Sequence, residues 1–500
     1  MTTNAFLALE HITVRHLDNT LFRELSWQVE NGQHWAIIGP SGSGKSALLN
    51  TLAGKFNVIN GAIRHHFYDA FIAAHPQDDP YFNYRRLMAT VSHHHQFKNH
   101  SNTTDFYYQQ RFNSSDSDDA PTVQSYLFGD APVDAKTMEW LTPLRIPSLL
   151  HKELIKLSNG ETRRTMIAHA LLQQPKLLML DNPFIGLDVQ ARKDFQEMIN
   201  HIISSLGTTV LLVTSPHEIP DMITHVLTLD EGRITGTYTR EAFMALPQAA
   251  VKETALPAFD KDLITKLTAH APREHFDVIV GMQDVNVKYG DARILQNIHW
   301  TIRPNDKWAL LGPNGAGKST LLSLINADNP QAYANRIVLF DRRRGSGESI
   351  WDIKRRIGFV SPELHQYFAT QANCLQIVGS GFHDTIGPIR SNTPEQLEIA
   401  RGWMQVLGID SYANQPFKQV PESIQRIALL ARALVKNPPL LIFDEPCQGL
   451  DARQKEHFKQ VIEALCAALP VTLVFVTHYV EELPASVDKF IRLDKGRQVE

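Results

Sequence analysis

The sequence has few of the features that would place a protein outside the cell or within a membrane. It contains only three cysteines, Cys374, Cys447 and Cys466, and their wide spacing predicts neither a disulfide framework nor a zinc site. The first residues lack the basic and then apolar pattern of a signal peptide. No apolar run approaches the ~20 residues that span a bilayer. We therefore expect a cytoplasmic protein, and any membrane part would come from another chain.

Strong net charge is also lacking. The 49 basic residues nearly balance the 53 acidic ones, for a net charge of -4, so the composition indicates no general affinity for nucleic acid. Hydrophobic residues make up 43% of the chain and charged residues 20%, which is typical of soluble globular proteins. A chain of 500 residues is too long for one core, so two domains are expected.

The main organisational feature is an internal repeat. The stretch "IIGPSGSGKSALLNTL" (37–52) recurs as "LLGPNGAGKSTLLSLI" (310–325), which is 273 positions later. Residues 156–188 match residues 419–451 at an offset of 263 instead. The first copy therefore holds ten more residues than the second in its middle part.

Each copy reads as short apolar runs that alternate with helical patterns. This alternation predicts an α/β fold with a mainly parallel sheet. We expect one domain over residues 1–240 and a second over residues 276–500. The segment between them, 241–275, is expected to be a linker with a short helix or two. Residues 94–120 are polar and predict a surface loop.

Each copy contains the pattern G-x-x-x-x-G-K-[ST], which is typical of a phosphate-binding loop, or P-loop. Its glycines let backbone N–H groups curl around phosphates at a helix N-terminus, and its lysine adds a positive charge. The serine after the lysine is a ligand type for Mg²⁺. The residues expected to bind ATP in this way are Gly39, Ser41, Gly42, Ser43, Gly44, Lys45, Ser46 and Ala47, and Gly312, Asn314, Gly315, Ala316, Gly317, Lys318, Ser319 and Thr320.

Acidic residues end two matching apolar runs, "LLMLD" and "LLIFD". At these places Asp181 and Asp444 are expected to hold Mg²⁺ together with Ser46 and Ser319, although a simple turn aspartate is the alternative. Glu445 follows Asp444 and would orient the water that attacks ATP. Asn182 stands at this place in the first copy, and an amide cannot take up a proton.

Together, the P-loops, "LSNGE" (157–161), "LLIFDEP", the two "GLD" sequences and "VTH" (476–478) resemble the ATP-binding-cassette ATPases. The resemblance covers nearly the whole chain except the linker. It implies two tandem cassettes, each with a mainly parallel sheet and a helical subdomain, paired head to tail. Each ATP would lie between one cassette's P-loop and the other's signature sequence. The signature residues implied here are Ser158, Asn159, Gly160 and Glu161, although "LSNGE" alone is also an ordinary helix N-cap.

The resemblance also implies that the two ATP sites differ. The second signature, at residues 420–424, reads "VPESI". The resemblance implies that His478 contacts the γ-phosphate, and His478 matches Ser215 in the first copy. His217, two residues later, is either a displaced substitute or, as we favour, a surface histidine. All the losses fall on the site built around Lys45. We therefore expect one hydrolytic site, with Glu445 and His478 as catalytic residues, and one degenerate site.

Two further features are expected from the resemblance. Tyr289 and His16 both lie 29 positions before a P-loop lysine, where the family stacks an aromatic ring on adenine. The glutamine that senses Mg²⁺ has no clear equivalent: Pro362 or Glu363 lies near its place in the second copy, and Gln96 lies a few residues beyond it in the first.

Within the family, "DRRRGSGESIWDIKRRIGFVSPELH" (341–365) resembles the ModF/PhrA group, whose names refer to molybdenum transport and photorepair. This implies an energy-coupling subunit that acts with a membrane permease, in the cytoplasm or at the inner membrane surface, with molybdate as one candidate cargo. The alternatives are a soluble ATPase that acts on ribosomes or nucleic acid, or an ATP-dependent regulator. Arg342–Arg344 would bind an anion or a partner, or else form a solvated loop.

Overall fold

The computed structural model describes residues 4–16, 19–92, 121–129, 131, 133–246, 260–269, 274–290, 292–361, 368, 371–385 and 387–499. The chain divides into two compact units, Met1–Ala249 and Ala250–Glu500. We call them the first and the second unit. The polar segment 94–120 and the glutamine candidates Gln96, Pro362 and Glu363 lie outside the described residues.

The first unit is built on two sheets. The larger has the strand order β5-β6-β7-β3-β8-β9, parallel except for the pair β8–β9. The smaller is antiparallel, with the order β2-β1-β4. The strands are β1 (Ala5–His16), β2 (Asn19–Glu30), β3 (Trp35–Ile38), β4 (Asn57–Arg64), β5 (Met88–Ser92), β6 (Leu177–Asp181), β7 (Thr209–Val213), β8 (His225–Asp230) and β9 (Arg233–Thr239).

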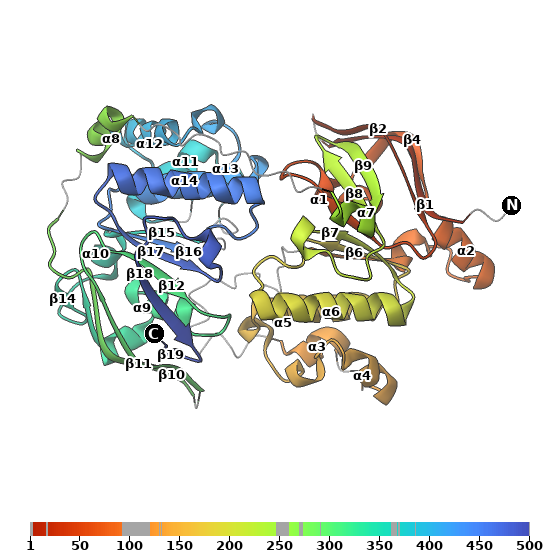
Figure 1. Ribbon diagram of the computed structural model, residues 1–500, viewed down its shortest axis with the longest axis horizontal. Coiled ribbons are helices and arrows are strands. Elements are labelled where there is room, and N and C mark those ends of the chain that lie inside the picture. Colours follow the sequence, from red (N-terminus) through yellow and green to blue (C-terminus); the bar gives the residue numbers. More distant parts are fainter. Residues whose placement is uncertain are drawn as a thin grey trace. The chain divides into compact units, whose positions relative to one another are not determined.

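Helices of the first unit can cover both faces of the larger sheet because its central strands are apolar on both faces. Every residue of β6 and β7 is buried, as expected for strands covered on both sides. Figure 1 shows α6 running along these strands, and Phe195 and Ile199 of α6 join the core beneath them. The helices are α1 (Lys45–Leu52), α2 (His66–Ala74), α3 (Val123–Phe128), α4 (Ala135–Leu141), α5 (Asn159–Leu171), α6 (Val189–Leu206) and α7 (Arg240–Met244).

The second unit repeats this plan. Its larger sheet has the order β15-β16-β17-β12-β18-β19 and its smaller sheet the order β11-β10-β13-β14. The strands are β10 (Val280–Tyr289), β11 (Ala292–Ile302), β12 (Lys307–Leu311), β13 (Arg336–Leu339), β14 (Arg342–Arg343), β15 (Ile357–Val360), β16 (Leu440–Asp444), β17 (Thr472–Thr477), β18 (Lys489–Asp494) and β19 (Arg497–Gln498). The α/β class with mainly parallel sheets, predicted from the repeat, is thereby confirmed.

The helices of the second unit include one from the segment between the two expected domains. These helices are α8 (Lys261–Thr268), α9 (Lys318–Ile325), α10 (Ile350–Lys354), α11 (Cys374–Gly379), α12 (Pro394–Val406), α13 (Glu422–Leu434) and α14 (Ala452–Ala468). Helix α8 lies in the segment expected as a linker and buries Ile264 and Leu267 against α12. Gly402 of α12 allows this close approach, since a Cβ there would lie 2.5 Å from Leu267.

The arginine run of the second unit does not act as one surface. Arg342 and Arg343 are exposed in β14, but Arg344 is buried in an ion pair with Glu348, with N–O distance 2.6 Å. Glu348 also accepts hydrogen bonds from the backbone N–H groups of Gly345 and Ser346. The charge of Arg344 is therefore used within its own loop. Because Arg344 is not available to an external anion, the three arginines do not form one anion-binding surface.

Among the described residues, no helix is both long enough and apolar enough to cross a bilayer.

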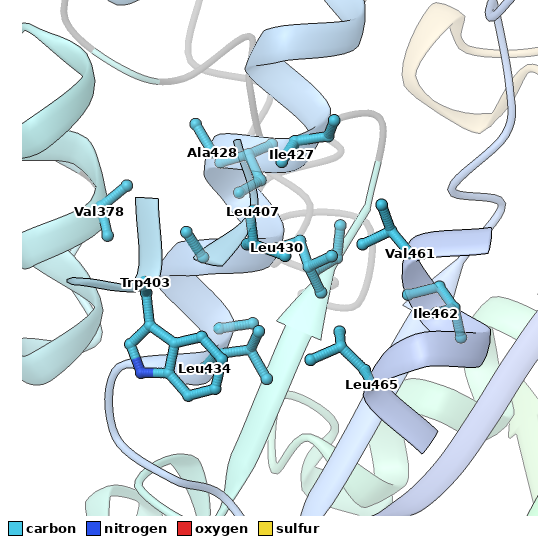
Figure 2. Packing of buried hydrophobic residues seen from close by; sticks show 14 of the residues in the cluster. Val378, Trp403, Leu407, Ile427, Ala428, Leu430, Leu434, Val461, Ile462 and Leu465 are labelled. Atoms are coloured by element: carbon cyan, nitrogen blue, oxygen red, sulfur yellow. The ribbon is translucent and has the colours of Figure 1, made fainter. Parts of the chain in front are cut away.

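The helical side of the second unit has a dense apolar core. Figure 2 shows Leu430 of α13 between Trp403 of α12 and Val461 of α14. Leu430 is fully buried. Truncation of its side chain would therefore measure how much the packing of α13 against α12 and α14 contributes to stability.

We expect Leu430→Ala to lower the free energy of unfolding of the second unit by about 2–5 kcal/mol, because it removes buried methyl groups and leaves a cavity. Urea unfolding followed by circular dichroism would measure this. Ile389→Ala is the matched control, since Ile389 is 76% exposed. Equal effects of the two substitutions would contradict the packing described here.

Candidate functional site

The two P-loops have nearly the same backbone. Gly42 and Gly315 have φ of 80° and 77°, and Gly44 and Gly317 have φ of 103° and 102°. These are left-handed conformations that glycine adopts without strain. A Cβ at Gly42 or at Gly315 would meet no protein atom within 4 Å. Glycine is therefore favoured at these two positions by the left-handed backbone and not by crowding from other protein atoms. The space beside them is open to a phosphate.

The lysine of each P-loop lies within its own loop. Nζ of Lys45 donates to the carbonyl oxygens of Gly39 and Pro40, at 2.8 and 2.6 Å. Nζ of Lys318 donates to Gly312 and Pro313, at 2.8 and 3.0 Å. Each ammonium is thus held next to the N-terminus of the helix that follows, α1 or α9. A helix N-terminus and a fixed cation together form an anion site.

The other P-loop residues divide by exposure. Ser43 and Ala316 are buried, at 2% exposed each, so they would reach a phosphate only through their backbone N–H groups. Thr320 is also buried. The remaining predicted residues lie at the more open side of the loops or in the first turn of the helix, namely Ser41, Ser46, Ala47, Asn314 and Ser319.

Ser46 and Asp181 form a pair suited to Mg²⁺ in the first unit. Asp181 ends β6 and is 7% exposed, and it accepts hydrogen bonds from Ser46 and Asn182. Burial raises the pKa of Asp181, against the opposing effects of Ser46, Lys45, Asn182 and Arg163. In the described part of the chain, no cluster of three or more acidic, histidine or cysteine side chains forms a metal site. One carboxylate and one hydroxyl fit a magnesium ion that keeps phosphate oxygens and water.

The residue after each aspartate has the same unusual backbone. Asn182 and Glu445 have φ of 50° and 48°. Their N–H groups donate to Val213 and Val476, the matching residues of β7 and β17, at 3.0 and 2.9 Å. Asparagine enters this left-handed region more readily than glutamate. The two copies thus have the same backbone conformation at this position but different side chains. Glutamate is the less favourable of the two residues in this conformation.

Glu445 belongs to a compact cluster in the second unit. Its Oε1 lies 2.5 Å from Nε2 of His478, close enough for an ion pair although not aligned as a regular hydrogen bond. Nδ1 of His478 lies 2.8 Å from the carbonyl oxygen of Gly312 and 3.2 Å from Nζ of Lys318. Gln448 donates to the other oxygen of Glu445. A potential base, a histidine and the P-loop lysine therefore meet within one unit.

The first unit has a different arrangement at this place. Ser215 donates to Glu218 at 2.8 Å, and Glu218 forms an ion pair with Arg192 of α6. His217 is exposed, in agreement with its reading as a surface histidine. Nothing in the described part of this unit reproduces the contact of Glu445 with His478.

The first signature sequence begins helix α5 with a capping box. Ser158 accepts a hydrogen bond from the backbone N–H of Glu161, and the Glu161 carboxylate accepts one from the backbone N–H of Ser158 at 2.7 Å. Lys152 pairs with the same carboxylate. Burial acts to raise the pKa of Glu161, but the hydrogen bonds from Lys152 and Ser158 outweigh it and lower the pKa. Asn159 is the first residue of the helix. Helix α13 begins instead after Pro421, without a side-chain cap.

The aromatic candidates for adenine differ in their surroundings. Tyr289 ends β10, is partly buried, and accepts a hydrogen bond from Asn329 at 2.9 Å. His16 ends β1, is exposed, and lies against Phe56 with ring centroids 4.5 Å apart. The ring of His16 is thus the more open of the two.

The sequence patterns did not single out two arginines that are buried in the structure. Arg163 of α5 is 5% exposed and donates to the carbonyl oxygens of Ser92 and Ile185, near Asp181. Burial lowers its pKa to about 10, although Asp181 opposes this effect. Arg426 of α13 is 2% exposed and donates to Gln448. The two arginines are 263 positions apart, so the offset of the internal repeat could have identified them as equivalent residues. Both tie the signature helix to the segment that follows the aspartate.

Comparison with known proteins agrees with the repeat. A model of the ABC transporter family matches residues 22–185 and 295–448. The starts of these two regions differ by 273 and their ends by 263, which are the two offsets of the internal repeat.

The chain is similar over much of its length to several ABC transporter ATP-binding proteins. It is 36% identical over 468 residues to the ABC transporter ATP-binding protein ModF of Escherichia coli (strain K12), covering 91% of this chain and 90% of the relative. It is 30% identical over 488 residues to an uncharacterized ABC transporter ATP-binding protein of Schizosaccharomyces pombe, covering 96% of each. A similar protein of Saccharomyces cerevisiae is 29% identical and covers 68% of this chain and 69% of its own length.

We expect Asn182→Glu to lower the free energy of unfolding of the first unit by roughly 1–2 kcal/mol. A glutamate there would take up the left-handed conformation less readily and would place a second carboxylate beside Asp181. Thermal unfolding would measure the change. Asn182→Asp is the control, because aspartate tolerates the backbone but adds the same charge. A glutamate variant as stable as the wild type would show that the backbone at this position is not strained.

Proposed function

The chain belongs to the ABC transporter family as an ATPase with two ATP-binding domains similar to ModF, and we propose that it hydrolyses ATP at only one of two composite sites. The hydrolytic site would combine the P-loop of the second unit with the signature Ser158–Glu161 of the first. The degenerate site would combine the P-loop of the first unit with residues 420–424. The domains proposed are 1–240 and 276–500, with 241–275 between them.

The cluster of Glu445, His478 and Lys318 carries this proposal. Phosphoryl transfer depends mainly on positioning and on neutralising charge, so a carboxylate beside the phosphate-binding loop is well placed to orient the attacking water. Mg²⁺, held by Ser319 and Asp444, would neutralise the phosphate charge when ATP is bound. Lys318 would contact the β- and γ-phosphates. His478, between Glu445 and the P-loop carbonyl of Gly312, would hold the carboxylate in place and contact the γ-phosphate.

The first unit supports binding without efficient turnover. Its P-loop glycines have nearly the same backbone angles as those of the second, and Lys45, Ser46 and Asp181 would hold phosphates and Mg²⁺. At the position of the base, however, the Asn182 amide donates to Asp181, and Ser215 is engaged by Glu218. ATP held here would act as a lasting bridge between the units. Tyr289 and His16 would contact the adenine rings of the two nucleotides.

The environment of Gly160 provides a way to test the crosswise arrangement. A Cβ on this residue would have only ordinary contacts, at 3.4 Å from Leu187 and 3.9 Å from Ala191. The fold of the first unit therefore does not require a glycine here. A requirement for glycine would come from a group outside this unit, and a phosphate bound to the second P-loop is the group proposed.

The transport role is proposed from the relatives, which are named as ABC transporter ATP-binding proteins. The chain would couple ATP hydrolysis to a membrane permease made by another gene, at the cytoplasmic surface of the membrane. Molybdate is the cargo that the sequence resemblance suggests. Purification from membranes with such a permease would support this role, whereas purification with ribosomes would favour the soluble alternative.

We expect Glu445→Gln to lower ATP turnover by about 100- to 1,000-fold, because it removes the base but keeps the shape of the site. Lys45→Ala should leave a measurable part of the turnover, since it damages only the degenerate site. Phosphate release would measure both, and binding of a fluorescent ATP analogue would check that Glu445→Gln still binds nucleotide. Asn182→Ala is the matched control for Glu445→Gln. Equal losses from these two variants would refute the asymmetry.

We expect Gly160→Ala to lower turnover at least ~10-fold without loss of stability, because alanine favours a helix over glycine and fits the first unit. Ser423→Ala, the matching change in the second signature, should leave turnover nearly unchanged. Phosphate release and thermal unfolding would be measured together. Full activity of a stable Gly160→Ala variant would argue against contact between this helix and the hydrolysed ATP.

A further inference from the structure

A cavity of about 310 Å³ lies in the first unit at the far end of β3 from the P-loop. Trp35 begins β3, whereas the P-loop follows Ile38 at the other end of the strand. The cavity is therefore separate from the nucleotide site proposed above. Residues of β2, β3, β8 and β9 and of the turn before β3 line it, among them Glu30, Gln33, Trp35, His225, Thr237 and Tyr238.

The second unit contains the same framework at the corresponding place. Trp27 and Trp35 meet edge to face with ring centroids 5.3 Å apart, and Trp300 and Trp308 do so at 5.8 Å. Gln33 accepts hydrogen bonds from the Trp35 indole and the backbone N–H of Glu30, at 3.1 and 2.9 Å.

Asp306 repeats the part played by Gln33. It accepts hydrogen bonds from the Trp308 indole and the backbone N–H of Arg303, at 3.2 and 2.9 Å. The two places are thus equivalent in structure and can be compared residue by residue.

The second unit fills this place with a cation of its own. Lys489 pairs with Trp308 across the parallel strands β12 and β18. Its ammonium lies 5.8 Å from the Trp308 ring centroid and forms an ion pair with Asp306. Attraction to the ring face and to a carboxylate holds such a cation. Burial acts to raise the pKa of Asp306, but the hydrogen bonds from Lys489, Arg303 and Trp308 and the charge of Lys489 together lower it.

The first unit has the same aromatic wall but no lysine in this register. His225 pairs with Trp35 across β3 and β8, and the two rings stack with centroids 4.8 Å apart. Burial lowers the pKa of His225, although Glu30 acts in the other direction. Burial therefore favours the neutral imidazole, and Gln33 carries no charge. Glu30 supplies a carboxylate, whose Oε2 accepts a hydrogen bond from Asn4. The cavity walls thus carry net negative charge.

We propose that this cavity binds a primary ammonium group from outside the unit, against the Trp35 and His225 rings and with Glu30 as its counter-ion. The bound group would take the role that the Lys489 ammonium has against Trp308 and Asp306. Gln33 would remain a support for Trp35, and the hydroxyl groups of Thr237 and Tyr238 would line the entrance. The ammonium would belong either to a small amine or to a lysine side chain of a polypeptide.

The test uses the full chain labelled with ¹⁵N at tryptophan, with the indole signals of Trp35 and Trp308 assigned from Trp35→Phe and Trp308→Phe. Titration with n-butylammonium chloride should shift the Trp35 signal saturably and leave the Trp308 signal in place. Butan-1-ol and sodium chloride at matched concentrations are controls for the alkyl chain and for ionic strength. A Trp35 signal that does not saturate, or that responds equally to butan-1-ol, would overturn the proposal.

Substitutions then test each part of the site. Glu30→Gln should weaken n-butylammonium binding about two- to fivefold, the range for exposed charge and cation–ring attraction. His225→Lys should abolish the response of Trp35 by supplying an internal ammonium. Lys489→Ala should make Trp308 responsive for the first time. An unchanged affinity of Glu30→Gln, or a silent Trp308 in Lys489→Ala, would overturn the proposal. ATP turnover and thermal unfolding of each variant would check that the fold is intact.

A lysine-containing tripeptide with blocked ends distinguishes the two sources of the ammonium group. Tighter binding of the tripeptide than of n-butylammonium would identify a polypeptide ligand, and weaker binding a small amine. Binding of neither would overturn the proposal.

Discussion

The function of each unit depends on the parallel arrangement of its central strands. Because parallel strands end at one edge of a sheet, β12, β16 and β17 bring the P-loop, the Asp444–Glu445 pair and His478 together. These segments are up to 166 positions apart in the chain, as in the contact of His478 with Gly312. The first unit obtains the same convergence from β3, β6 and β7. The sheet therefore fixes where the chemical groups stand, and the individual side chains decide what they can do.

Much of this arrangement could be predicted, because the repeat provides two independent readings of one pattern. The P-loops, Asp181 and Asp444 were found in this way, and so was the replacement of glutamate by Asn182. Other features depend on three-dimensional contacts that spacing does not encode. The run 342–344 looked like one basic surface, but the ion pair with Glu348 withdraws Arg344 from it. The double role of Glu161, in the capping box and in the pair with Lys152, was also not visible.

The buried arginines show where a closer reading of the sequence would have gone further. Arg163 and Arg426 obey the 263 offset, yet an arginine in a helix is usually taken for a solvated residue. Only burial reveals that each ties its helix to the segment after the strand-end aspartate. The surroundings of Trp35 and Trp308 likewise could not be compared from the sequence alone. Their aromatic frameworks match, and the difference in charge becomes meaningful only when Lys489 is seen beside Trp308.

The left-handed backbone after each strand-end aspartate has an evolutionary consequence. Asparagine satisfies the same N–H bond to the neighbouring strand with less strain, so glutamate at such a position costs stability that only its chemistry would offset. Under the proposal of a single hydrolytic site, the local backbone would favour the amide at the other site. Return to glutamate would then pass through a less stable protein, so the proposed difference between the two sites would be hard to reverse.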